Sequence, residues 1–165
     1  MICFGLNAPI KRHTVAEWIR NHDQHTGCLQ ETHFRIQDVH RLKVKFWKKI
    51  FPASGQERKA SVAILITDKI DFKTKAIKRD PEGHFIILKR RIHQEDINII
   101  NMYAPNIGAP KYIRKIFDNL RKYINSNTIT VGDFNTPLSK RIDLPKKYQQ
   151  EYCRTERPIR SNELN

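Results

Sequence analysis

The hydrophobic and polar residues of the chain follow two periods, which predict strands and helices in turn. Residues 60–67 are a largely apolar run rich in Ile, typical of a strand buried on both faces. From Pro110 onward, apolar side chains recur at helical spacing while lysines and arginines take much of the rest, which predicts an amphipathic helix packed on a sheet. The apolar positions of this helix are Ile113, Ile116, Phe117, Leu120, Tyr123 and Ile124.

The same patterns predict the remaining elements. Strands are expected at residues 26–31, 72–79, 84–92 and 96–103, and from residue 128 onward. Asp80-Pro81-Glu82-Gly83 has the residues that a type I turn prefers, so the strands on either side of it should form a hairpin. A helix near Pro9–His22 is expected to turn four apolar side chains towards the core: Ile10, Val15, Trp18 and Ile19. Strands that alternate with helices make the fold class α/β.

Two basic segments each admit two interpretations. Around residues 41–49, Phe46 and Trp47 either stack on nucleic-acid bases or point inward from an edge strand, and we favour the second. The charges of the expected hairpin form either a solvated edge that resists aggregation or a stripe for the DNA backbone. These charges are Lys73, Lys75, Lys78, Arg79, Lys89, Arg90 and Arg91.

The amino-acid composition gives the chain a strong excess of positive charge. The 165 residues include 31 Lys and Arg against 17 Asp and Glu, a formal net charge of +14. Such an excess indicates a polyanionic partner, most simply DNA; a basic protein that adheres to DNA without a site is the alternative. We find neither an apolar run of membrane-spanning length nor a signal-peptide pattern. The chain is therefore expected to be intracellular, nuclear or cytoplasmic rather than secreted, and not to bind membranes.

The cysteines indicate reduced thiols. Cys3, Cys28 and Cys153 are an odd and scattered set, which argues against a disulfide framework. Cys28 also lies near three histidines, His22, His25 and His33, but no second cysteine follows at zinc-finger spacing. Zinc is therefore not expected.

Candidate catalytic residues follow the last expected strand. A β-branched run from Thr128 is broken at Gly132, and Asp133 and Asn135 then stand two apart, which places their side chains on the same side of an extended backbone. A carboxylate and a carboxamide in this position suit the activation of water beside a phosphate oxygen. The alternative is an Asx turn that closes the strand. Two earlier strands end in a similar way, one at Glu31 and one at Tyr103.

Together these phrases resemble the endonuclease/exonuclease/phosphatase superfamily, most closely the apurinic-endonuclease-like domain of the long interspersed element (LINE) retrotransposon polyprotein. The similarity runs from about Phe4 to Ser139. It implies the first half of a four-layer α/β sandwich, with a mixed sheet and two main helices, over residues 1–139, followed by a polar tail at 140–165. Besides the three strand ends, it rests on Gly5-Leu6-Asn7, Ile10-Lys11-Arg12-His13, His40-Arg41-Leu42-Lys43, Val62-Ala63-Ile64-Leu65, Ile77-Lys78-Arg79-Asp80 and Gly108-Ala109-Pro110.

The residues and the resemblance imply metal-assisted phosphodiester hydrolysis. Mg²⁺ prefers one or two carboxylates together with waters and phosphate oxygens, and Glu31 is the expected ligand for Mg²⁺ or Mn²⁺. Asp133 would orient or deprotonate the attacking water, Asn135 would hydrogen-bond the scissile phosphate, and Tyr103 would contact the phosphate or the developing charge. Asn106, in the adjacent loop, is assigned a structural role.

The chain also departs from the family pattern. Ile2 and Phe4 stand where the family has polar residues near its metal site, and the family's terminal Ser-Asp-His is not found. We therefore expect a truncated endonuclease domain with little or no activity, or alternatively a non-catalytic remnant that binds nucleic acid through its basic surface. The partner sheet is also expected to be missing, which would expose an apolar face and favour self-association.

Overall fold

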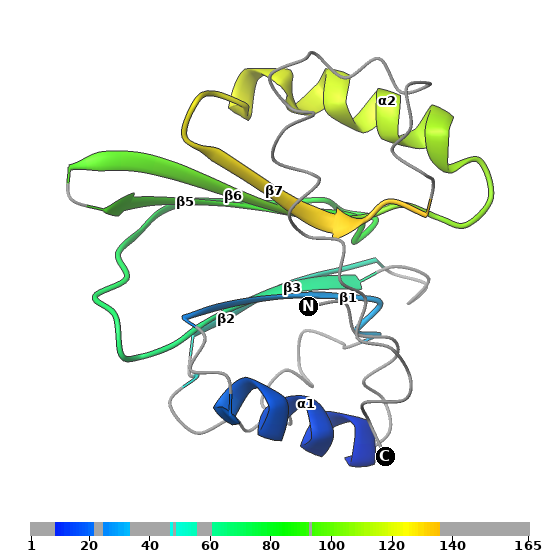
Figure 1. Cartoon of the computed structure of the whole chain (residues 1–165). Helices are drawn as coiled ribbons and strands as arrows, with labels where there is room; N and C mark the ends of the chain where they lie inside the picture. The colour runs from blue at the N-terminus through cyan, green and yellow to red at the C-terminus, as the bar shows by residue number, and fades with distance from the viewer. Residues whose placement is uncertain are drawn as a thin grey trace.

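Two β-sheets pack face to face between two helices in the computed structural model (Figure 1). The structure describes residues 9–21, 25–33, 47, 49–55, 61–92 and 94–135. In chain order, their elements are α1 (Pro9–Asn21), β1 (Thr26–Gln30), β2 (Lys49–Ser54), β3 (Ser61–Ile66), β4 (Thr74–Arg79), β5 (Phe85–Ile92), β6 (Glu95–Tyr103), α2 (Ala109–Leu120), the 3₁₀ turn η2 (Arg121–Tyr123) and β7 (Thr128–Asp133).

The first sheet has the strand order β1-β3-β2, and both of its pairings are antiparallel. All six residues of the central strand β3 are buried, which confirms the strand predicted from the apolar run at 60–67. Val62, Ile64 and Ile66 belong to the core between the sheets, so the alternate residues Ala63 and Leu65 face outward, and they are buried as well. A strand covered on both faces needs apolar residues at successive positions, and this run supplies them.

The second sheet has the order β4-β5-β6-β7 and is mixed, because β6 and β7 are parallel while the other pairings are antiparallel. The predicted hairpin is confirmed: β4 and β5 pair across the turn at Asp80–Gly83. Gly83 has φ 82°, a conformation that glycine adopts without steric cost, and its N–H donates to Asp80 O at 3.0 Å. The amide of His84 donates to Asp80 Oδ2 at 2.9 Å and closes the turn.

The main core lies between the two sheets. Val62, Ile64 and Ile66 of β3 meet Ile86 and Leu88 of β5 in one buried cluster. The expected absence of a partner sheet is therefore wrong, because the strands before and after residue 67 form separate sheets that cover each other's apolar faces. In the described part of the chain, the exposed sheet face that motivated self-association is thus not present.

The predicted amphipathic helix corresponds to α2 and the short 3₁₀ turn that continues it. Ile113, Ile116 and Leu120 are buried against the second sheet, in a cluster with Ile87 and Ile100. Phe117, Tyr123 and Ile124 are partly buried at its margin. In Figure 1, α2 covers the outer face of the second sheet, and α1 lies on the outer side of the first. The class is α/β, as expected.

The positions of three side chains either contradict a prediction from the sequence or decide between two alternatives. Ile10 is 79% exposed, so its predicted core position is wrong; it stands five residues before Val15, which turns it about 140° away around the helix. Trp47 is 5% exposed, and a Cβ on Gly27 would lie 3.6 Å from its ring, so it points inward rather than towards nucleic acid. Arg90 is only 7% exposed and stacks over Phe72, so it does not decorate the hairpin.

Several expectations lie outside the described residues: Gly5-Leu6-Asn7, Ile2, Phe4, the histidine His22, residues 34–46 and the boundary at 139 with its tail. Val15 is half-buried, while the side chains of Trp18 and Ile19 are not described. Within the described ranges, no helix combines the length and the apolar character needed to cross a bilayer.

Candidate active site

The candidate residues lie where three strands end. Tyr103 is the last residue of β6, Asp133 is the last residue of β7, and Glu31 follows β1 directly. Tyr103 and Asp133 are register partners in the parallel β6–β7 pair, so they occupy the same edge and the same face of the second sheet. The amide of Ala104 then donates to Asp133 O at 2.8 Å, which keeps the two chains together just past that edge.

The Tyr103 hydroxyl joins the two carboxylates. Tyr103 is 7% exposed and its hydroxyl donates a hydrogen bond to the Glu31 carboxylate. Burial, this hydrogen bond and the negative charges of Glu31 and Asp133 raise the pKa of the phenol well above its ordinary value. Because both carboxylates act on one hydroxyl group, Glu31, Tyr103 and Asp133 share a single site although they come from both sheets.

Asn135 lies beside this site in a turn. Its backbone N–H donates to Asp133 Oδ1 at 3.1 Å, which is the Asx turn considered as an alternative in the sequence analysis. Its side-chain Nδ2 donates to Ala104 O at 2.6 Å, which attaches the turn to the end of β6. A primary amide carries two N–H bonds, so one remains for a ligand while the other holds the side chain in position.

The backbone at Glu31 and Asn135 is in the left-handed region, with φ of 50° and 44°. Non-glycine residues adopt this conformation uncommonly, and it persists where surrounding contacts hold it. After Glu31 these contacts come from Ser61: its carbonyl accepts from Thr32 N at 3.2 Å, and its hydroxyl lies 2.8 Å from Thr32 Oγ1. Contacts with Ser61, the first residue of β3, therefore fix the backbone after Glu31 and with it the orientation of the Glu31 side chain.

A buried polar bridge behind the site was not found from the sequence. Asn101 of β6 is fully buried and donates from Nδ2 to the carbonyls of Leu29 and Ala63, each at 2.9 Å, in the other sheet. Gln30, also fully buried, donates from Nε2 to Asn101 Oδ1. Because Gln30 immediately precedes Glu31, this bridge places the end of β1 against β6. The signal in the sequence was a polar residue interrupting each apolar strand near its end.

His84 also contacts the site residue Tyr103. The two rings are stacked with centroids 6.2 Å apart, and the Nδ1 atom of His84 lies 3.3 Å from Tyr103 O. On its other side, the imidazole lies 4.9 Å from the ring of Tyr112. No sequence pattern indicated a role for His84; these contacts make it a support for the position of Tyr103.

The donor set of the site suits a hard cation better than zinc. Among the described residues, no group of three or more His, Cys, Asp and Glu side chains is placed to hold a metal ion. Glu31 supplies one carboxylate, and Mg²⁺ is bound through one or two carboxylates while waters and phosphate oxygens complete its shell. Cys28 is buried, and desolvation raises the pKa of its thiol to about 12, which disfavours the thiolate that zinc requires.

Comparisons with known proteins extend this description. Residues 3–146 match the model of the endonuclease/exonuclease/phosphatase family. One similar solved structure is the endonuclease domain of TRAS1, a telomere-specific non-LTR retrotransposon, with 17% identity, a TM-score of 0.57, and coverage of 82% of this chain and 58% of that chain. A second is D. rerio TDP2 in complex with a single-strand DNA product, with 11% identity, a TM-score of 0.58, and coverage of 82% and 60%.

A third similar structure is ANGEL2, a 2′,3′-cyclic phosphatase, in complex with adenosine-2′,3′-vanadate. It has 15% identity and a TM-score of 0.58, and the match covers 79% of this chain and 45% of that chain. At these identities the similarity establishes a shared fold. The chain spans less than two thirds of the length of each of these three structures.

Proposed function

The chain belongs to the endonuclease/exonuclease/phosphatase family, and we propose on this premise that it is a Mg²⁺-dependent endonuclease domain that nicks DNA. The LINE-type specificity is proposed from the phrases around Glu31, Tyr103 and Asp133. The observation that carries the proposal is the Tyr103 hydroxyl, which is hydrogen-bonded to the Glu31 carboxylate and lies in the field of Asp133. A phenol whose pKa is perturbed by burial and by specific carboxylate partners is typical of a functional site.

In the proposed mechanism, each residue has one role. Glu31 would hold the divalent cation, Mg²⁺ or Mn²⁺ as its substitute, and the cation would supply charge stabilisation at the phosphate. Asp133 orients the attacking water and accepts its proton. Asn135 donates the second N–H of its amide to a phosphate oxygen. The Tyr103 hydroxyl has a single proton, so it donates to the charge that develops there in exchange for its hydrogen bond to Glu31.

The local structure supports these roles in two ways. The hydrogen bond from Asn135 N to Asp133 Oδ1 leaves the second oxygen of Asp133 for water, so one turn can hold the base and the phosphate donor together. The high pKa of the Tyr103 phenol keeps its proton in place at neutral pH, as a hydrogen-bond donor requires. The TRAS1 and TDP2 structures support DNA as the substrate class, since one is an endonuclease and the other holds a DNA product.

The proposed rate is low for this chain by itself. Ile2 and Phe4 stand where the resemblance places polar residues near the metal. Removing a preorganised group from such a site costs about 10²–10³-fold in rate. The alternative proposal is a basic module that binds nucleic acid without cutting it, which the net charge of +14 favours.

A plasmid assay separates these two proposals. Supercoiled DNA is incubated with Mg²⁺ and either the unmodified protein, Glu31→Gln or Asp133→Asn, with Asp118→Asn as an exposed carboxylate control on α2. We expect EDTA and both site substitutions to lower nicking at least about 100-fold, while the control stays within about twofold. Equal nicking by all four proteins would exclude the endonuclease, and DNA binding that weakens steeply with salt would then support the binding module.

A further inference from the structure

The outer face of the second sheet changes character along its strands. Ile87 of β5 is opposite Ile100 of β6, and both lie in the apolar cluster under α2. Two residues further along each strand, on the same face, Lys89 is opposite Asn98, and then Arg91 is opposite Asp96. The face is therefore apolar beneath the helix and cationic at the end where β5 and β6 are joined.

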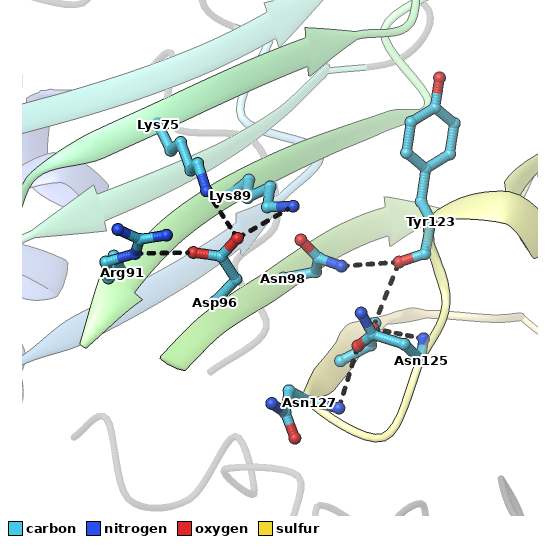
Figure 2. Close-up of polar contacts among 9 residues, drawn as sticks. Lys75, Lys89, Arg91, Asp96, Asn98, Tyr123, Asn125 and Asn127 are labelled. Atoms are coloured by element: carbon cyan, nitrogen blue, oxygen red, sulfur yellow. Dashed lines mark hydrogen bonds and ion pairs between the residues drawn. The ribbon is translucent and has the colours of Figure 1, made fainter. Parts of the chain in front are cut away.

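Three cations of this end converge on one carboxylate. Asp96 Oδ2 accepts from Lys75 Nζ at 2.7 Å and lies 3.3 Å from Lys89 Nζ, while Arg91 Nε donates to Oδ1 at 3.2 Å (Figure 2). Asp96 is largely enclosed by them, with 27% of its side chain exposed, whereas the exposed fractions of the cations are 46% for Lys75, 38% for Lys89 and 60% for Arg91.

Two more cations adjoin this group around Tyr123. Lys78 Nζ lies 3.1 Å from the Tyr123 hydroxyl, and Lys122 Nζ lies 5.3 Å from the centre of the ring. Asn98 Nδ2 donates to Tyr123 O at 2.8 Å, which joins this part to β6 beside Asp96 (Figure 2). We define the cationic end as Lys75, Lys78, Lys89, Arg91 and Lys122. Three of these cations contact Asp96 and two adjoin Tyr123, so the five positive charges exceed the one carboxylate by four.

Protection of a sheet edge does not account for this arrangement. Lysines on an edge strand prevent aggregation, and Lys75 and Lys78 lie on the edge strand β4. Lys89 and Arg91, however, lie on β5, which is paired on both sides by β4 and β6. Asp96 orders the three cations without neutralising them, and each ammonium group has three donors, so exposed donors remain for an external anion.

Asp96 and the three cations that contact it are remote from the candidate active site. Asp96 and Tyr103 are seven positions apart on the extended strand β6, which corresponds to about 23 Å at ~3.3 Å per residue. Their side chains also point to opposite faces of the sheet, since residues at odd separation alternate. A phosphate held by Glu31 and Tyr103 is thus beyond the reach of these lysines.

We propose that the cationic end is a second DNA-binding surface, which contacts the phosphate backbone of a segment of duplex outside the candidate active site. A row of exposed cations without a base-reading element fits sequence-independent phosphate contact. The inference does not depend on the proposed nicking activity, since a protein that never cuts DNA would still bind through this surface.

The test is a salt titration of DNA binding. Binding of a fluorescently labelled duplex DNA of mixed sequence is followed by anisotropy at increasing salt, with EDTA present so that cleavage plays no part. Each phosphate contact contributes about 0.9 to the slope of log K against log salt. For the triple variant Lys75→Gln, Lys89→Gln and Arg91→Gln, we expect the slope to decrease in magnitude by about 2–3.

The matched control removes three exposed lysines elsewhere, Lys73→Gln, Lys111→Gln and Lys115→Gln, and thus changes the net charge equally. We expect its slope to change by less than about 1. Equal changes in both triple variants, or none in the first, would overturn the proposal. Each single variant Lys75→Gln and Lys89→Gln leaves two cations on Asp96 and should reduce the magnitude of the slope by about 0.9. These variants keep the test valid if the triple variant misfolds.

Discussion

Asn101 offers a quantitative test of how the two sheets are held in register. The substitution Asn101→Leu keeps the number and branching of the side-chain heavy atoms but removes three hydrogen bonds at a fully buried position. Two of them are the 2.9 Å bonds from Nδ2 to Leu29 O and Ala63 O, and the third is the bond that Oδ1 accepts from Gln30. The Gln30 amide would then be buried with no acceptor from Asn101.

The expected cost is about 3 kcal/mol of the free energy of unfolding, at ~1 kcal/mol for each lost bond. Urea unfolding followed by circular dichroism measures it. With a slope of about 2 kcal/mol per molar urea, the midpoint should fall by about 1.5 M. The control Asn98→Leu removes one bond, from Nδ2 to Tyr123 O at 2.8 Å, at a residue 6% exposed, and should cost about 1 kcal/mol.

The costs of the two asparagine substitutions show whether the Asn101 bridge holds the two sheets together. If Asn101→Leu lowers the free energy of unfolding no more than Asn98→Leu does, the bridge does not hold the sheets. A second result sharpens the test: Gln30→Leu should cost less in the Asn101→Leu background than alone, because the first substitution already removes the acceptor of its amide. Additive costs would show that the two side chains do not act together.

Three further outcomes follow from individual contacts. Gly132→Ala should lower the free energy of unfolding by about 2–3 kcal/mol in urea, because the new methyl group would lie 2.2 Å from Met102 O; a loss below about 0.5 kcal/mol would contradict this packing. Glu31→Gln should lower the pKa of the Tyr103 phenol, followed by NMR of its ring carbon, since one of the negative charges that oppose its ionisation is removed; an unchanged pKa would refute the contact. The pKa of Asp96 is held below its ordinary value of 3.8, mainly by the hydrogen bond from Lys75. The Asp96 carboxylate therefore stabilises the fold fully above pH 3.8, and this stabilisation is lost as the pH falls below 3.8. The difference in unfolding free energy between the protein and Asp96→Asn should therefore shrink below pH 3.8, and a constant difference would contradict it.

Sequence patterns predicted secondary-structure elements correctly where these depend only on residues close together in the chain. The apolar run at 60–67, the turn residues at 80–83 and the helical spacing from Pro110 each predicted an element that the structure contains. Periodicity and turn chemistry depend on neighbours within a few positions, so they can be read without knowing what packs against them. The fold class followed from the order of these elements.

The assignment of the strands to two separate sheets could not be predicted from local sequence patterns. Whether successive strands join one sheet or two is decided by which apolar faces meet, and this is why the expected exposed face is instead the core around Ile64 and Leu88. The same holds for single side chains: Arg90 is charged and lies in a hairpin, yet Phe72 covers it, and no neighbour in sequence reveals that contact.

By itself, the sequence determined the candidate groups at three strand ends: Glu31, Tyr103 and Asp133. The tertiary structure decided that they meet, through the parallel register of β6 with β7 and the buried bridge from Asn101 to the first sheet. The hydrogen bond between Tyr103 and Glu31 spans the two sheets. A pattern of residues can identify such groups, but the distance between them depends on how the complete sandwich packs, because their separation along the chain places no limit on how closely they approach.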